Sequence, residues 1–146
     1  MKIHTPEGVE RLRTLYSVMA GVPTEKVYMS CWRTSSAGDD RLIGDCGTSA
    51  CAIGWACAYP EFQEQGLGYD THAGVPSFQG NLNWHAVMSF FGVSESTADH
   101  LFQTDEQGLV AKRGVLRRIR KLLLENGVIT EERSGELVAM EQALTA

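Results

Sequence analysis

The sequence predicts a mainly α-helical protein that folds as one compact bundle of five or six helices. Apolar residues recur at helical spacing in several segments, and residues typical of helix caps flank these segments. The length of 146 residues is close to that of one domain. A composition of 43% hydrophobic and 21% charged residues is typical of a globular protein and argues against a disordered chain. We therefore expect residues 1–146 to form a single globular helical domain.

The first helix is predicted over residues 5–21. Thr5 suits the N-cap position and Pro6 the first turn of a helix. Apolar residues then follow at helical spacing: Val9, Leu12, Leu15, Tyr16 and Met19. The next residues, 22–32, suit either a short helix or a strand around Tyr28, and their conformation stays open.

A second helix is predicted over residues 49–58, with Thr48 or Ser49 as its cap. Every residue from 50 to 58 is small or apolar, so this helix has no polar face and belongs in the middle of the fold. Ala50, Gly54 and Ala58 recur every four residues and form a smooth strip. We expect another part of the backbone to lie close to this strip.

Four further helices are predicted in the second half of the chain. They span residues 82–91, 94–102, 109–124 and 130–144. The helix over 82–91 is apolar around nearly its whole circumference and should be as buried as the central one. Asn81 and Ser94 suit N-caps, and Gly92 suits a C-terminal cap.

Two segments indicate long surface loops, 33–45 and 63–80. The first is rich in glycine, serine and aspartate, and the second in glycine with a proline. The second loop leaves room for one short hairpin around Tyr69. No repeat or low-complexity tract indicates a further domain.

The composition also bears on location and metal binding. No apolar stretch approaches the ~20 residues that span a bilayer, and the first residues lack the apolar segment of a signal peptide, so we expect a cytoplasmic protein with no membrane contact. Without export, the four cysteines are better explained as free thiols or metal ligands than as disulfides: Cys31, Cys46, Cys51 and Cys57. Their spacing does not match the knuckles of structural zinc sites, which favours packing in the core over zinc. No metal or other cofactor is expected.

The net charge of −5 hides an uneven distribution. The predicted helix over 109–124 has six basic residues and no acidic one, which leaves seven basic and eighteen acidic residues, a net charge of −11, on the rest of the chain. Its exposed face carries the candidate partner-binding residues Arg113, Arg117, Arg120 and Lys121. Lys112 falls on the apolar side of this helix, so it must reach solvent or find a partner.

Three explanations of the basic helix stay open. It could bind an acidic protein, bind nucleic acid, or only balance the acidic remainder of the chain. An acidic host protein is favoured over nucleic acid, because the acidic remainder would repel the phosphates of a long duplex. The oligomeric state is not predicted.

A possible pocket involves Cys46, Thr48, His85 and Ser89. Cys46 precedes a predicted helix, whose N-terminal amides favour a thiolate. His85 and Ser89 share a narrow polar strip on an otherwise apolar helix, although a histidine satisfied within the core is the preferred explanation of His85. No histidine is placed by sequence to activate Cys46, and no known catalytic motif is present. We therefore name no catalytic residue and do not favour an enzyme.

The segment from Cys46 to Ala56, Cys-Gly-Thr-Ser-Ala-Cys-Ala-Ile-Gly-Trp-Ala, resembles a group of small uncharacterised proteins of bacteriophages and bacteria. The resemblance covers about residues 9–125 and includes Phe62, Gly66-Leu67, Phe90-Phe91-Gly92 and Leu101-Phe102. It implies a phage or bacterial source and supplies no mechanism. Small phage proteins of this kind often bind host machinery, including defence components.

The leading functional prediction is therefore a non-catalytic, phage-encoded interaction protein that binds and blocks or sequesters a host macromolecule. One alternative is a nucleic-acid-binding protein that uses the basic helix. The other is a small-molecule-binding protein or enzyme with a pocket near Cys46 and His85.

Overall fold

The computed structural model describes residues 1–29, 32–34 and 49–144, and these residues are mainly helical. The α-helices are α1 (Pro6–Gly21), α2 (Ala52–Ala58), α3 (Pro60–Glu64), α4 (Trp84–Phe91), α5 (Glu95–Phe102), α6 (Gly108–Glu125) and α7 (Glu131–Gln142). A short 3-10 helix, η1 (Thr24–Lys26), follows α1. The described residues thus form seven α-helices where five or six were predicted, because Pro60 begins the short additional helix α3.

Five short strands accompany the helices in the described residues. β1 (Arg33–Thr34) pairs with β2 (Ser49–Ala50), and β3 (Gly68–Asp70), β4 (Val75–Phe78) and β5 (Asn81–Leu82) form an antiparallel sheet in that order. In this sheet Tyr69 lies opposite Pro76. The hairpin predicted around Tyr69 is therefore present, and much of the predicted loop 63–80 is regular structure. Of the predicted loop 33–45, residues 35–45 lie outside the described part of the chain.

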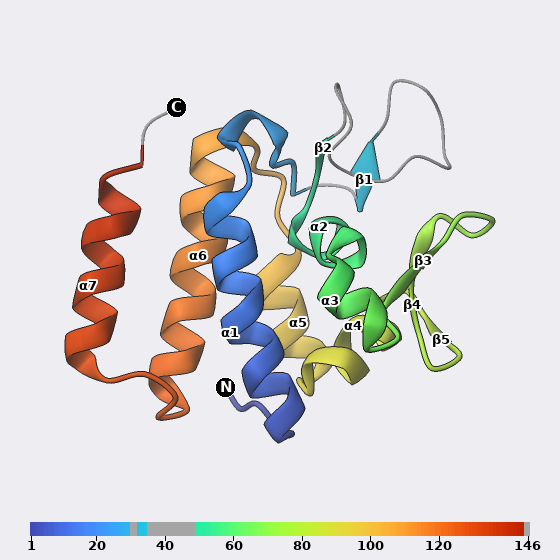
Figure 1. Ribbon diagram of the computed structural model, residues 1–146, viewed down its shortest axis with the longest axis horizontal. Helices are drawn as coiled ribbons and strands as arrows, with labels where there is room; N and C mark the ends of the chain where they lie inside the picture. The colour runs from blue at the N-terminus through green and yellow to red at the C-terminus, as the bar shows by residue number, and fades with distance from the viewer. Residues whose placement is uncertain (30–31, 35–48, 145–146) are drawn as a thin grey trace.

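The helices form layers on one side of the molecule, and the small sheet lies at the opposite end. Figure 1 shows α7, α6 and α1 side by side, with α2 to α5 between α1 and the sheet of β3, β4 and β5. Helix α1 contacts α6, α4 and α2, and α7 packs on α6. Helix α1 is therefore the central partner of the other helices.

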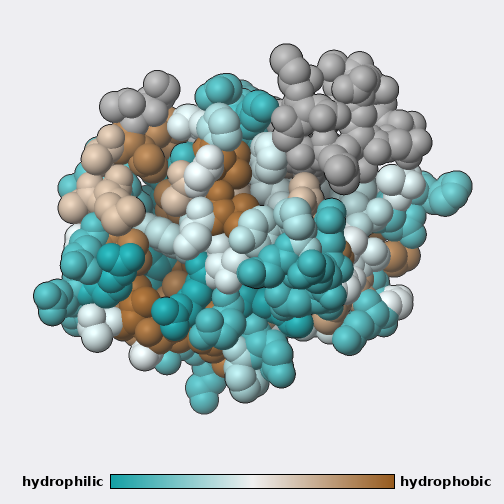
Figure 2. Space-filling model, in the orientation of Figure 1, coloured by the Kyte–Doolittle hydropathy of each residue, from teal (hydrophilic) through white to brown (hydrophobic). Residues whose placement is uncertain are grey.

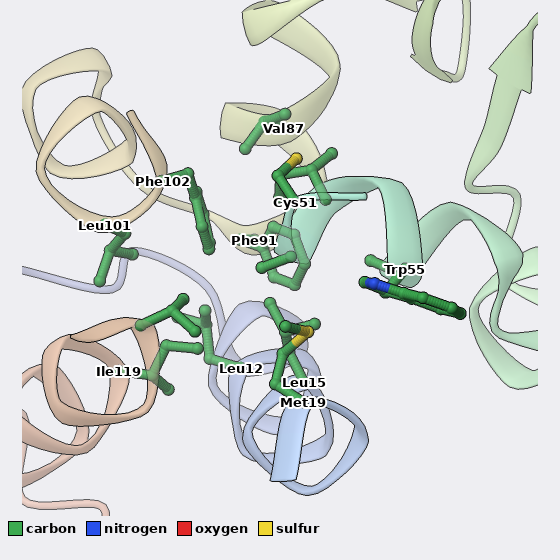
Figure 3. Close-up of a cluster of buried hydrophobic side chains, with 14 of the residues drawn as sticks. Leu12, Leu15, Met19, Cys51, Trp55, Val87, Phe91, Leu101, Phe102 and Ile119 are labelled. Atoms are coloured by element: carbon green, nitrogen blue, oxygen red, sulfur yellow. The ribbon is translucent and has the colours of Figure 1, made fainter. Parts of the chain in front are cut away.

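The hydrophobic core lies where α1 meets α2, α4, α5 and α6. Figure 3 shows side chains from four of these helices pointing toward one another: Leu12, Leu15 and Met19 from α1, Val87 and Phe91 from α4, Leu101 and Phe102 from α5, and Ile119 from α6. Trp55 of α2 is buried at the edge of this group. The rings of Phe62, Phe90 and Phe91 pack edge to face at centroid distances of 5.0–6.1 Å. Such edge-to-face pairs add to the stabilisation that burial alone provides.

Helix α2 is shorter than the helix predicted over residues 49–58, and it is as buried as predicted. Ser49 and Ala50 belong to strand β2, because their backbone pairs with β1, so α2 begins at Ala52 with Cys51 as its N-cap residue. Residues 52–57 are all buried. The expected close backbone contact is confirmed at Gly54, where a Cβ atom would lie 1.8 Å from the carbonyl oxygen of Trp32.

Helix α4 differs from the prediction at its start and in its burial. It begins at Trp84 rather than Leu82, because Leu82 pairs with β4, and Asn83 takes the N-cap position. Its inner face is buried, whereas His85 and Ser89 are exposed. The expected burial around the whole helix is therefore wrong, because only one side of α4 meets the core.

The predicted N-caps Thr5 and Ser94 are confirmed, and Thr130 caps α7 in the same way. The side-chain oxygens of Thr5, Ser94 and Thr130 accept hydrogen bonds from the backbone N–H groups of Gly8, Thr97 and Arg133, at 2.9, 3.3 and 3.0 Å. Gly92 ends α4 in the left-handed conformation, with φ of 61°.

None of the helices in the described ranges is long and apolar enough to cross a membrane.

Candidate functional site

The basic helix α6 contributes much less exposed charge than its sequence suggests. Arg120, predicted to face a partner, is only 8% exposed. Its Nε donates to Glu141 Oε2 at 2.9 Å and its Nη1 donates to Ser134 Oγ at 3.2 Å, both on α7. The exposed placement predicted for Arg120 is therefore wrong, because the docking of α7 on α6 encloses its side chain.

Arg113 also serves the contact between α6 and α7. Its Nη2 donates to the backbone carbonyls of Gln142, the last residue of α7, at 3.1 Å, and of Leu144, just beyond that helix. A guanidinium group suits this position, because the last carbonyls of a helix lack partners within the helix and carry partial negative charge. In Figure 2, apolar side chains also follow the seam between α6 and α7.

The lysine on the apolar side of α6 finds a partner, as predicted. Lys112 is 5% exposed, and its Nζ donates to the carbonyl oxygen of Val22 at 2.7 Å. Burial lowers the pKa of Lys112, and the carboxylate of Glu25 opposes this shift. This lysine therefore ties α6 to the turn after α1.

Two of the four predicted partner-binding residues remain exposed, Arg117 and Lys121. Neither forms an ion pair with another residue in the described ranges. Two exposed cations offer a weak electrostatic surface, because an ion pair between an exposed side chain and a partner contributes little binding energy and is screened by salt.

The pocket predicted near Cys46 and His85 is not assembled from described residues. Cys46 and Thr48 lie outside the described part of the chain, whereas His85 and Ser89 are exposed on α4. His85 is therefore not the buried core histidine that was the preferred explanation of this residue.

A different cavity, of about 550 Å³, lies beside the start of α4. We call it the aromatic cavity, and its described lining residues are Met29, Trp32, Cys51, Asn83, Trp84, Phe102, Gln103, Thr104 and Asp105. Its volume is within the range of sites that bind small ligands. Figure 3 shows two of its residues, Cys51 and Phe102, near Val87 and Phe91 of α4, so the cavity borders the core.

Two tryptophans form the aromatic part of the lining. The ring centroids of Trp32 and Trp84 lie 4.8 Å apart, with the ring planes at 56°, and both side chains are half-buried. Neither indole N–H donates to another residue in the described ranges, whereas Trp55 in the core donates its Nε1–H to the carbonyl oxygen of Lys26 at 3.1 Å. Trp32 and Trp84 therefore offer a ligand both aromatic surface and two N–H donors.

The polar lining comes from the start of α4 and the segment after α5. Asn83 has φ of 62° and ψ of −140°, a conformation that is rare for a residue other than glycine. Such strain persists only where the surroundings impose it, and the backbone N–H of Asn83 is held by the carbonyl of Pro76 at 2.9 Å. Gln103, Thr104 and Asp105 follow α5 and supply an amide, a hydroxyl and a carboxylate.

Backbone hydrogen bonds hold the segment 103–107 in place. Met29 donates its N–H to the carbonyl of Glu106, and Gly108 donates to the carbonyl of Val27, both at 2.9 Å. Tyr28 and Gln107 form an antiparallel bridge between the same two segments. The polar lining is thus positioned by residues 27–29, whose conformation the sequence left open.

The basic helix supports this segment from behind. Arg118 of α6 donates its Nε–H to the carbonyl of Leu101 at 3.1 Å, and its Nη1 lies 3.7 Å from Glu106 Oε1. Burial lowers the pKa of Arg118, and Glu106 opposes the shift. Because Leu101 and Glu106 flank Gln103 to Asp105, Arg118 acts as a positioning residue for the cavity.

The described lining of the aromatic cavity contains one thiol, Cys51, and one carboxylate, Asp105. The Sγ–H of Cys51 donates to the carbonyl of Trp32 at 3.6 Å. No histidine or lysine in the described lining is available as a base. No cluster of three or more histidine, cysteine or acidic side chains within the described ranges could hold a metal ion. Cys51 and Cys57 are buried, and Cys31 and Cys46 lie outside those ranges.

Sequence reasoning missed the residues of this cavity because they come from segments far apart in the chain. Trp32 ends the segment 22–32, whose conformation the sequence left open, and Asn83 falls inside the predicted helix over 82–91. The structure buries only one of the three tryptophans, Trp55, and leaves the indoles of Trp32 and Trp84 partly exposed. Searches against protein-family models, curated proteins and solved structures found no match to this chain.

Proposed function

We propose that this protein is a non-catalytic interaction protein that recognises its partner through the aromatic cavity. The observation that supports the proposal is the pair Trp32 and Trp84, which line the cavity and leave their indole N–H groups without acceptors among the described residues. Aromatic side chains with one polar end are typical of binding sites, where they provide large contact areas at small entropic cost.

The basic helix is the weaker candidate for the partner surface. Arg113, Arg118 and Arg120 are engaged within the fold, so a partner would meet mainly Arg117 and Lys121. This argues against nucleic acid, whose affinity depends on several phosphate contacts with cationic side chains. A partner of the aromatic cavity needs no such cluster.

The host-directed role belongs to the same proposal. The resemblance to small phage proteins suggests that the partner is a macromolecule of the host, which this protein blocks or sequesters. A cavity of about 550 Å³ is large enough to take one exposed side chain of such a partner, together with part of its backbone.

Partner capture from the host with three forms of the protein tests this proposal. The cavity variant is Trp84→Ala, its neighbouring control is Leu82→Ala, and the basic-helix variant carries Arg117→Gln with Lys121→Gln. We expect the partner to be lost with Trp84→Ala, because Trp84 lines the cavity. We expect it to be retained with the other two variants, because Leu82, Arg117 and Lys121 do not line the cavity. Loss with the basic-helix variant alone would contradict the proposal.

Trp84 also packs against the core, so the folding of each variant must be measured. Circular dichroism and the melting temperature provide that control. A second variant, Gln103→Trp, adds bulk at an exposed lining residue and leaves the core unchanged. It should block capture while the melting temperature stays close to that of the wild type.

A further inference from the structure

We infer that the aromatic cavity takes a planar organic cation, a guanidinium group, which packs against the indoles of Trp32 and Trp84 and pairs with the carboxylate of Asp105. This inference rests on the proposed binding function and adds the chemical class of the ligand. An arginine side chain of a partner protein and a free guanidinium compound share this chemistry, and the experiment below distinguishes them.

The charge of the lining favours a cation. Asp105 is the one charged residue in the described lining, and its exposed carboxylate pairs with no residue in the described ranges. Arg118, which positions the segment that carries Asp105, is engaged by the carbonyl of Leu101 and by Glu106. An anionic ligand would therefore meet a carboxylate and no cationic side chain of the described lining, whereas a cation would meet a carboxylate that has no partner in the described ranges.

The aromatic residues favour the same class of ligand. The face of an indole attracts cations more strongly than that of any other aromatic side chain, and guanidinium groups also stack on it. Trp32 and Trp84 are tilted by 56° to each other, so their rings offer surfaces in two directions. The side-chain amides of Asn83 and Gln103 add oxygens that accept hydrogen bonds from a guanidinium group.

The protein contains a site of this kind elsewhere, formed by its own Arg11. The guanidinium carbon of Arg11 lies 4.1 Å from the ring centroid of Phe90 and 5.5 Å from that of Phe78. Its N–H groups donate to the carbonyl of Phe90 at 2.9 Å and to Gln65 Oε1 at 2.8 Å. Two aromatic rings, a carbonyl and an amide oxygen thus hold a guanidinium group here. The aromatic cavity offers two rings, amide oxygens and, in addition, a carboxylate.

The test compares a short arginine peptide with the same peptide containing citrulline, which has the same shape and no charge. Binding to the full-length protein is followed by NMR or tryptophan fluorescence at millimolar concentrations, where a single side chain can be detected. We expect the arginine peptide to bind and the citrulline peptide to bind about tenfold more weakly or not at all. Equal binding of the two peptides, or no binding of the arginine peptide, would overturn the inference.

Two variants test the role of the carboxylate at matched charge. Asp105→Asn and Glu64→Gln each remove one negative charge. Glu64 is the control, because it is exposed on α3, does not line the aromatic cavity and forms no ion pair in the described ranges. Asp105→Asn should weaken the arginine peptide by about fivefold or more, and Glu64→Gln should not. If the two variants had equal effects, Asp105 would act only through general charge attraction, and its role as a direct partner of the guanidinium group would be overturned.

Further ligands separate this inference from the proposed function and identify the source of the group. The first is a neutral aromatic probe, indole. If indole binds the wild type but not Trp84→Ala, and arginine does not bind, the inference is overturned and the proposed binding function stands. Free arginine amide that binds as tightly as the peptide would indicate a small-molecule source. Stronger binding of the peptide would indicate an arginine presented by a protein.

Discussion

Replacing Gly54 by alanine should destabilise the protein through a single added methyl group. The Cβ atom of alanine would lie 1.8 Å from the carbonyl oxygen of Trp32 and 2.7 Å from the Cβ of Ala50. Because real Cβ contacts are essentially never shorter than 3.0 Å, Trp32 and α2 must separate by at least 1.2 Å. The obstacle is backbone, which cannot turn away as a flexible side chain can.

The expected magnitude follows from the cost of overpacking a well-packed core. A forced shift of this kind lowers the free energy of unfolding by about 1–3 kcal/mol. For a domain of this size the melting temperature should fall by about 2–12 °C. Because Trp32 lines the aromatic cavity, its indole should also move, and ligand binding should weaken together with stability.

Gly135→Ala is the matched control, because Gly135 also lies within a helix and a Cβ there would meet nothing within 4 Å. Alanine is the better helix former, so this variant should gain about 0.5–1 kcal/mol. Thermal unfolding followed by circular dichroism measures both variants, and the fluorescence of the tryptophans reports the displacement of Trp32. A Gly54→Ala protein with the melting temperature of the wild type would refute the close contact between α2 and Trp32.

Three further predictions concern the basic helix and its buried network. Arg120→Gln should lower the free energy of unfolding by about 3–5 kcal/mol, because it leaves the carboxylate of Glu141 buried without its cation. Chemical denaturation measures this loss, and a loss smaller than that of Arg117→Gln would contradict the prediction. Burial, and then the hydrogen bond to Glu141, raise the pKa of Tyr16 above its usual value of 10.0, so the neutral phenol stabilises the fold below pH 10 and this contribution is lost as the pH rises further. Tyr16→Phe should flatten the fall of stability above that pH, and an unchanged pH profile would argue against it. In gel-shift titrations the wild type should not bind DNA or RNA tightly at low salt; tight binding that disappears when Arg117 and Lys121 are changed to glutamine would reverse our choice of surface.

The uneven distribution of charge has a structural explanation in the contacts of α6. Arg113 and Arg120 hold α7, Lys112 holds the turn after α1, and Arg118 holds the segment that follows α5. Cations gathered on one helix therefore hold three neighbouring parts of the fold. A charged face in a sequence is thus weak evidence for a binding surface until the neighbours of its helix are known.

Local patterns in the sequence were sufficient to predict most of the helices. Thr5 and Ser94 were recognisable as caps, because a short polar side chain at that position satisfies a free backbone N–H whatever the rest of the fold does. The central place of α2 also followed from the sequence, since a helix without polar residues has no face to offer to water. Gly54 indicated a close contact because it has no side chain, and the contact is present.

The tertiary structure decided where strands replace helix ends and which charges remain exposed. Whether Ala50 and Leu82 join a helix or a strand depends on a pairing partner elsewhere in the chain. Arg117 and Arg120 stand three residues apart on α6, yet one is exposed and the other is buried, because α7 covers only one of them. The aromatic cavity likewise exists only where Trp32 and Trp84 meet the segment after α5. Periodicity describes one helix or strand at a time, and these outcomes depend on contacts between residues far apart in the chain.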